Sequence, residues 1–429
     1  MRYDTKADYS VHSLNALSSD VSMKNDFDSG IRLLDKWKSK FRNKPKLVLI
    51  NVSGGGLRAS MWAFRVMQVS DSLTGNRFIE SSHLITGASG GMIGAAYYRE
   101  LYLRHRLGLL DTFRDDEHLN NVGKDLLNPV ILSITVSDLF FNFQKFKDGT
   151  ERHSKDRAYV FEKQMNRNLD NVFDKRLRDY KSAESEAIIP MMIFTPTIVN
   201  DGRRLLISPH DISFLTHDQQ KPGFHFTPAV DGVEFRKLFK NQHADDLKFS
   251  SIIRMSATFP YILPAVSLPS TPTIQIMDAG MRDNTGLKTT LRYLYVFRKW
   301  IEENTSGVVV VDIRDSHKIR PVEPAPRKSI VENLVTPLGN IYGNLLTIQD
   351  YTIDESYYYA KSWFNGTLDF ITFELPTREQ EISLSWHLTT REKNSIYHTV
   401  DLDSNEVAFD RLTKVLDGNR MMNPLFDSK

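Results

Sequence analysis

The sequence predicts an α/β fold with a mainly parallel central sheet flanked by helices. Two observations support this class. An apolar run at residues 47–52 is followed by glycines and by a stretch with helical character at residues 58–73. The same order then repeats, with a short apolar run at 82–86 before a helical stretch at 92–106. Strands that alternate with helices in this way are typical of βαβ units, whose strands run parallel.

The remaining chain extends this pattern on both sides. Residues 1–30 are polar without a clear period, and we expect a loose N-terminal arm there. Residues 31–46 place Leu33, Leu34, Trp37 and Phe41 at helical spacing among basic residues, which predicts a basic amphipathic helix. One α/β domain is expected over 47–400, with a mainly helical insertion or cap at 107–186, and a C-terminal helix and tail over 401–429. Further strands are expected at 188–194, 204–207, 273–277, 307–313 and 368–373.

Composition excludes several classes of protein. The 429 residues carry 55 basic and 53 acidic side chains, so the net charge of +2 gives no chain-wide attraction to nucleic acid. The absence of cysteine removes disulfides and thiol catalysis, and it fits a reducing compartment. No uncharged run approaches the roughly 20 residues of a spanning helix. We expect a cytoplasmic protein with peripheral membrane contact. The sequence leaves open whether membrane segments precede residue 1.

A candidate nucleophile lies in the stretch Gly87-Ala88-Ser89-Gly90-Gly91, which matches G-x-S-x-G. In a nucleophile elbow, small residues such as Gly87 and Gly91 allow a tight turn from strand to helix that exposes the serine hydroxyl. A short apolar strand precedes this stretch and a helix follows it, as the elbow requires. The alternative is an ordinary glycine-rich turn in which Ser89 caps the helix.

The glycine triplet Gly54-Gly55-Gly56 follows the first predicted strand. The carboxyl ends of consecutive parallel strands meet at one edge of a sheet, so this loop and Ser89 are expected to be neighbours. The backbone amides of these glycines can then form an oxyanion hole for a carbonyl that Ser89 attacks. Arg58 would either stabilise the loop or bind a phosphate. A nucleotide-phosphate loop fits poorly, because neither G-x-G-x-x-G nor G-K-[ST] is present.

A base is expected at Asp278, which follows a predicted strand and precedes Ala279 and Gly280. We expect it at the same carboxyl edge of the sheet. Its pKa must be raised by burial for it to accept a proton near neutral pH. A turn-capping aspartate is the alternative, and Asp312 in "VVVVDIRD" is a rival carboxylate.

These stretches together resemble the patatin-like phospholipase superfamily, including its cytosolic phospholipase A2 branch. The resemblance is carried by "SGGGLRA", "GASGG" and "DAG" in this order, and by "MSATFPYILPAV" ahead of the aspartate. It implies hydrolysis of lipid acyl esters by a Ser89–Asp278 dyad, with Gly54, Gly55, Gly56 and Arg58 as the oxyanion element and without a metal or cofactor. Many patatins begin the loop with Asp and end it with Gly, whereas Ser53 and Ala59 stand here.

Two other readings stay open. A Ser-His-Asp esterase would need a histidine after the acid, and His317, His387 and His398 are candidates. A catalytically silent lipid-binding protein could keep the fold without using the chemistry.

A lipid hydrolase also needs contact with a membrane or micelle surface. The stretch at 131–146, with Phe140, Phe141, Phe143 and Phe146, is the first candidate for an interfacial element, although such aromatics are more often core. The basic helix expected at 31–46 is the second candidate, against packing of its apolar stripe on the sheet. The sequence gives no indication of oligomeric state.

Overall fold

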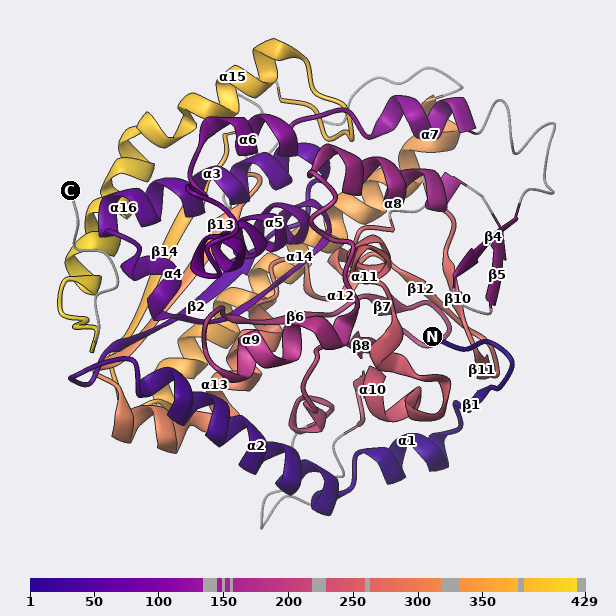
Figure 1. Cartoon of the computed structure of the whole chain (residues 1–429), viewed down its shortest axis with the longest axis horizontal. Coiled ribbons are helices and arrows are strands. Elements are labelled where there is room, and N and C mark those ends of the chain that lie inside the picture. Colours follow the sequence, from indigo (N-terminus) through magenta and orange to yellow (C-terminus); the bar gives the residue numbers. More distant parts are fainter. Residues whose placement is uncertain are drawn as a thin grey trace.

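A computed structural model describes residues 1–133, 145–148, 151–154, 157–217, 229–258, 263–317, 332–376 and 382–422. The predicted α/β class is confirmed (Figure 1). The strands are β1 (Ala7–Asp8), β2 (Lys46–Val52), β3 (Ser82–Gly87), β4 (Lys145–Asp148), β5 (Glu151–Ser154), β6 (Met191–Phe194), β7 (Thr197–Ile198), β8 (Arg204–Leu206), β9 (Gly232–Glu234), β10 (Val266–Leu268), β11 (Ser270–Thr271), β12 (Ile274–Met277), β13 (Gly307–Arg314) and β14 (Leu368–Glu374). The α-helices are α1 (Val11–Leu17), α2 (Asp20–Lys38), α3 (Gly56–Thr74), α4 (Arg77–Ser81), α5 (Ser89–Arg106), α6 (Asp116–Val122), α7 (Leu127–Ser133), α8 (Arg157–Asn168), α9 (Lys181–Ser185), α10 (Phe235–Leu238), α11 (Phe249–Ser256), α12 (Gly280–Asp283), α13 (Leu287–Asn304), α14 (Glu332–Trp363), α15 (Thr390–His398) and α16 (Asp403–Leu416).

The central sheet has five strands in the order β14-β13-β2-β3-β6, and every neighbouring pair is parallel. Strand β2 is central, and its side chains are almost fully buried because helices cover both faces of the sheet. All five strands therefore end at one edge. The loops that follow β2 and β3 leave from this edge side by side.

Alternate side chains of β2 enter two separate cores. Val48, Ile50 and Val52 pack with α3 and α5 on one face. Leu47 and Leu49 pack with α2 and α13 on the other face. Figure 1 shows α3 and α5 on one side of β2 and α13 and α2 on the opposite side, so the molecule has three layers at its centre.

A second sheet of five short strands has the order β10-β12-β7-β8-β9. Strand β12 pairs antiparallel with both β10 and β7, so the expectation that Asp278 follows a strand of the parallel sheet is wrong. The two sheets are joined where the Phe194 backbone exchanges hydrogen bonds with Ile207. Short apolar strands carry no signal for the sheet that they join, because this choice depends on long-range pairing.

The N-terminal region differs from the expected loose arm. Residues 11–17 and 20–38 are helical, so the expected helix at 31–46 begins earlier and ends earlier. Ser10 caps α1 by accepting the backbone N–H of Ser13, a local signal that the lack of apolar periodicity concealed. In α2, the apolar stripe with Leu34 and Trp37 is buried against the sheet. This stripe is packed in the core, so the membrane interpretation of it is wrong.

The insertion expected at 107–186 contains α6, α7, α8, α9 and the β4–β5 hairpin in its described parts. The aromatic residues Phe140, Phe141 and Phe143 of the candidate interfacial stretch lie outside the described residues. Within the described ranges, no helix combines the length and the apolar character needed to cross a bilayer.

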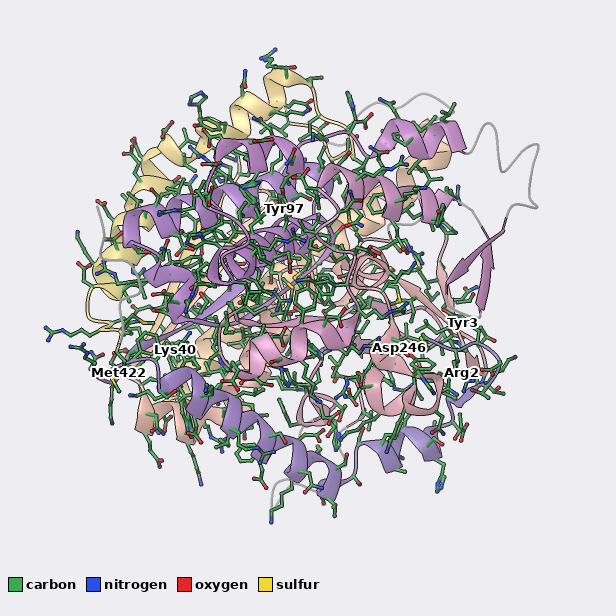
Figure 2. The ribbon with its side chains drawn as sticks, viewed as in Figure 1. Arg2, Tyr3, Lys40, Tyr97, Asp246 and Met422 are labelled. Atoms are coloured by element: carbon green, nitrogen blue, oxygen red, sulfur yellow. The ribbon has the colours of Figure 1, made fainter. Side chains whose placement is uncertain are left out.

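The two ends of the described chain are both anchored to the body of the protein. Near the N-terminus, the Arg2 backbone donates to the Gln242 carbonyl at 2.7 Å. Near the C-terminus, Met422 donates to the carbonyl of Lys40 at 2.7 Å, and the two residues lie close together in Figure 2. The segment after α16 therefore closes over the end of α2.

Candidate active site

Ser89 lies at the first position of α5, and only Ala88 separates it from Gly87 at the end of β3. Its φ of 48° is in the left-handed region, which is strained for a serine and typical of a nucleophile elbow. The side chain is 6% exposed. The N-termini of α5 and α3, which carry the positive ends of the helix dipoles, both lie near Ser89, because α3 begins at Gly56 beside the elbow.

Small residues make the elbow possible by close backbone approach. A Cβ at Gly90 would overlap the carbonyl oxygen of Gly56, and a Cβ at Gly91 would overlap the carbonyl oxygen of Ser53. Gly87 has a φ of 157°, and a Cβ there would overlap the carbonyl oxygen of Val52. The glycine loop after β2 and the elbow after β3 are therefore in direct contact.

The amides of the glycine loop are not equivalent. The N–H of Gly54 donates to the backbone carbonyl of Asn284 at 3.1 Å. The N–H groups of Gly55 and Gly56, at the start of α3, have no hydrogen-bond partner among the described residues. First-turn amides of a helix lack intrahelical acceptors, so Gly55 and Gly56 are available to an oxyanion in this arrangement and Gly54 is not.

Arg58 is engaged by the protein itself. Its Nε and Nη2 donate to Oδ2 of Asp315 at 3.1 and 2.8 Å, and its Nη1 donates to the carbonyl of Ile382 at 3.0 Å. The Asp315 backbone N–H donates to the Ser53 hydroxyl at 2.8 Å. Arg58 thus fixes the glycine loop through Asp315, and its guanidinium does not point at an open phosphate site here.

Asp278 is fully buried beside Ser89. Its Oδ1 accepts the N–H of Gly280 at 2.8 Å, whereas its Oδ2 has no hydrogen-bond partner in the described part of the chain. Burial raises the pKa of Asp278 to about 6. The Gly280 N–H opposes this rise, and so does the Ser89 hydroxyl, which lies near the carboxylate without completing a hydrogen bond to it. A carboxylate with this pKa is ionised at neutral pH and is a stronger base than an exposed aspartate.

Asp278 reaches the elbow although its strand belongs to the second sheet. Its N–H donates to the Thr258 carbonyl at 3.0 Å, and its own carbonyl accepts the Thr197 hydroxyl at 2.9 Å. The following segment returns to the central sheet, where the Asn51 side chain donates to the Thr285 carbonyl at 3.0 Å. These bonds hold the segment after β12 against the carboxyl edge of β2 and β3.

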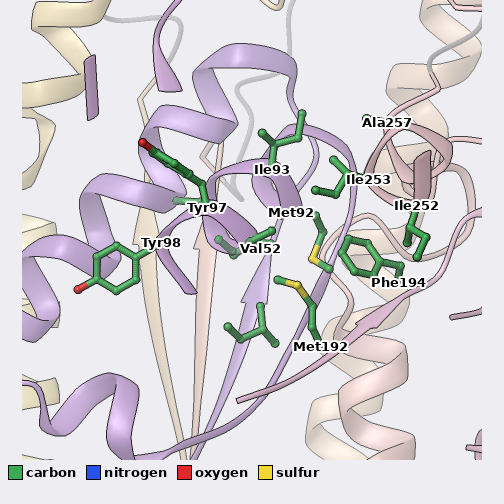
Figure 3. Close-up of a cluster of buried hydrophobic side chains, with 14 of the residues drawn as sticks. Val52, Met92, Ile93, Tyr97, Tyr98, Met192, Phe194, Ile252, Ile253 and Ala257 are labelled. Atoms are coloured by element: carbon green, nitrogen blue, oxygen red, sulfur yellow. The ribbon is translucent and has the colours of Figure 1, made fainter. Parts of the chain in front are cut away.

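The floor of the site is apolar. Figure 3 shows Val52 of β2 and Met92 of α5 near Met192 and Phe194 of β6, with Ile253 of α11 closing the cluster. Each of these side chains is buried. This packing fixes the start of α5, and therefore Ser89, relative to the sheet.

The other carboxylate and histidine candidates lie in different surroundings. Asp312 pairs with Arg314 at 3.5 Å, and Arg314 also pairs with Asp350 of α14 at 2.7 Å. The three histidines each face another carboxylate: His317 with Glu374 at 2.7 Å, His387 with Asp125 at 3.3 Å and His398 with Asp401 at 3.3 Å. All three are at least two fifths exposed, and each faces a carboxylate other than Asp278.

Three residues of the site were missed by the sequence analysis. Asp315 is the second aspartate of "VVVVDIRD", and its position at the end of a strand next to β2 was a usable signal. Asn284 had a weaker signal, which was its position six residues after Asp278. Gln349 of α14 donates to the Gly280 carbonyl at 2.9 Å, and no pattern in the sequence connects it to the site. Among the described residues, no group of three His, Asp or Glu side chains is placed to hold a metal ion.

The fold is an α/β fold with a mainly parallel central sheet, and Ser89 lies in the turn between β3 and α5. Comparison with known families matches residues 51–291 to the patatin-like phospholipase family, which is more than half of the chain. The chain belongs to this family, and the resemblance seen in its motifs is confirmed. No curated protein matches the sequence.

A comparison with solved structures matches this chain to a human phospholipase and to a bacterial protein. Human GIVD cytosolic phospholipase A2 in complex with methyl gamma-linolenyl fluorophosphonate has a TM-score of 0.41 and 10% identity, over 96% of this chain and 64% of that one. VipD from Legionella pneumophila has a TM-score of 0.33 and 12% identity, over 88% of this chain and 67% of that one. The chain thus spans slightly less than two thirds of the human protein.

Proposed function

We propose that the protein is a serine lipid acyl hydrolase that cleaves carboxylic esters of phospholipids or related lipids. The proposal is carried by the strained Ser89 at a helix N-terminus, which lies near the fully buried Asp278, whose pKa burial raises to about 6. Membership of the patatin-like phospholipase family supports the lipid substrate class. We further propose that the substrate is met at a membrane or micelle surface.

The proposed reaction uses Ser89, Asp278, backbone amides and water. Asp278 takes the Ser89 hydroxyl proton as the oxygen attacks the ester carbonyl, and the resulting oxyanion is stabilised by the free amides of Gly55 and Gly56. The tetrahedral intermediate collapses, and the leaving alcohol takes the proton from Asp278. Water then attacks the acyl-enzyme, with Asp278 again accepting a proton. Asp278 passes this proton to the Ser89 oxygen as the fatty acid leaves, which restores the free enzyme.

A fluorophosphonate probe tests the proposal directly. We expect the folded wild type to be phosphonylated at Ser89, and Ser89→Ala to remain unlabelled. Mass spectrometry of lipid extracts incubated with the two proteins should show free fatty acid and lysolipid with the wild type alone. A folded wild type that neither reacts with the probe nor releases fatty acid would favour the silent lipid-binding protein instead.

The dyad is distinguished from a Ser-His-Asp triad by substitution. His387 lies in the segment that covers the glycine loop, since Ser385 accepts the N–H of Leu57 at 2.9 Å, so His387→Ala is the most demanding test. We expect this variant to hydrolyse a short-chain ester at close to the wild-type rate, and Asp278→Ala to be inactive. Loss of turnover in a folded His387→Ala protein would make the triad the correct mechanism.

A further inference from the structure

Asn284 lies directly after α12 and touches the glycine loop. Its backbone carbonyl accepts the Gly54 N–H at 3.1 Å. Its side chain reaches the same glycine, because a methyl group added at Gly54 would lie 2.7 Å from Oδ1 of Asn284. The same methyl group would lie 3.2 Å from Cβ of Ser89. The Asn284 amide and the nucleophile therefore flank one point beside Gly54.

The side-chain amide of Asn284 has no hydrogen-bond partner among the described residues, and the residue is half-buried. A primary amide offers two N–H donors and one acceptor, and its oxygen and nitrogen exchange places by a half turn of the end group. An unpaired amide next to a candidate nucleophile is free to meet the substrate. Because the Gly54 N–H is already used within the protein, the Asn284 amide can add a donor to those of Gly55 and Gly56.

A single side chain from the C-terminal part of the chain holds this segment in place. Oε1 of Gln349 accepts the backbone N–H of Asn284 at 2.9 Å. Nε2 of Gln349 donates to the carbonyls of Gly280 at 2.9 Å and of Met281 at 3.2 Å. Gly280 in turn donates its N–H to Oδ1 of Asp278. Gln349 thus braces the short turn that carries both Asp278 and Asn284.

We propose that Asn284 is a further catalytic residue, whose side-chain amide donates a hydrogen bond to the carbonyl oxygen of the substrate, and that Gln349 is its positioning residue. The inference rests on the proposed function. Negative charge grows on that oxygen as Ser89 attacks, so a donor fixed beside it stabilises the transition state more than the ground state. Gln349 lies in α14, beyond the 51–291 segment that matches the family, so the C-terminal region completes the site.

The test measures kcat and KM on a soluble short-chain ester such as 4-nitrophenyl butyrate. In Asn284→Ala the backbone bonds to Gly54 and Gln349 remain, so the protein should fold. Loss of one oxyanion donor is expected to lower kcat by about 10²-fold, with KM changed by less than about threefold. Asn284→Asp, which has nearly the same shape, should lose more, because a carboxylate repels the growing negative charge. If Asn284→Ala does not fold, Asn284→Asp provides the answer.

The role of Gln349 is tested by measuring the pH dependence of kcat/KM in Gln349→Ala. Without the bonds to Gly280 and Met281 the turn loosens, the Gly280 N–H holds the Asp278 carboxylate less well, and the acid limb of kcat/KM should move to higher pH. Thr352→Ala, one turn further along α14, is the matched control and should behave as the wild type.

Three results would count against this inference. A kcat for Asn284→Ala within about threefold of wild type would overturn the role of Asn284 as a donor. An unchanged acid limb in Gln349→Ala would make this glutamine an ordinary structural contact. A folded wild type with neither probe labelling nor turnover would refute the proposed function, and the inference would fall with it.

Discussion

Replacement of Asp278 by asparagine should abolish turnover and at the same time stabilise the fold. The carboxyl is fully buried, and burial raises its pKa from an ordinary value of 3.8 to about 6. Asparagine has nearly the same shape, keeps an oxygen to accept the Gly280 N–H, and carries no charge to desolvate. An active-site group that is unfavourable for folding is expected where catalysis needs a strong base.

The size of the effect follows from the two pKa values. Because the folded state binds this proton more tightly than the unfolded state, stability falls as the pH rises through the interval between 3.8 and about 6. Above that interval the full penalty is present, and two pKa units correspond to about 3 kcal/mol. Below pH 3.8 the carboxyl is protonated in both states and the penalty vanishes. Roughly half of it is expected by pH 5.

Urea denaturation of Asp278→Asn and wild type at pH 5 and pH 8 measures this difference. The advantage of the variant in free energy of unfolding should be larger at pH 8 by about 1.5 kcal/mol. Ser89→Ala, which leaves the carboxyl in place, is the control and should not gain this pH-dependent advantage. An advantage of the same size at both pH values would refute the reasoning, because the buried charge would then not be its source.

Three further predictions concern the same site. In the wild type, kcat/KM should rise with an acid limb near pH 6, since only the ionised Asp278 accepts the serine proton; a pH–rate profile without a limb between about pH 5 and 7 would exclude this base. Asp315→Asn should lower stability by about 3 kcal/mol and reduce kcat/KM, because Arg58 is then left largely buried without its partner charge; thermal unfolding and ester turnover measure the two effects. Gly90→Ala should lose about 1–3 kcal/mol of stability and most of its activity, because the new methyl group overlaps the Gly56 carbonyl; retention of full activity would show that the loop contact is not needed.

Local patterns were sufficient where the chemistry is carried by contiguous residues. The elbow around Ser89 was recognised because its glycines, the preceding strand and the following helix lie within one short stretch. The glycine loop was placed beside it because parallel strands joined by one helix must end at the same edge. The structure has both features in contact through Gly90 and Gly56.

Capping and packing explain where local patterns failed. Residues 11–17 form a helix that is capped by Ser10, and residues 20–30 belong to α2, which packs closely on α13 where Gly30 meets Phe297, although the sequence of both segments is polar. The apolar stripe with Leu34 and Trp37 was compatible with a membrane or a core, and only the position of α2 over the sheet decided between them. Composition alone does not distinguish two apolar environments.

The sequence by itself determined the α/β class, the family, and the serine, glycine and aspartate motifs. Each of these features depends on residues that are neighbours in the chain and adopt a fixed backbone geometry. Tertiary structure alone decided that Asp278 arrives from a second sheet, that Arg58 is held by Asp315, and that Asn284 and Gln349 adjoin the site. These relations join residues that are distant in the chain. They depend on how separate elements pack, and no local periodicity or spacing encodes that packing.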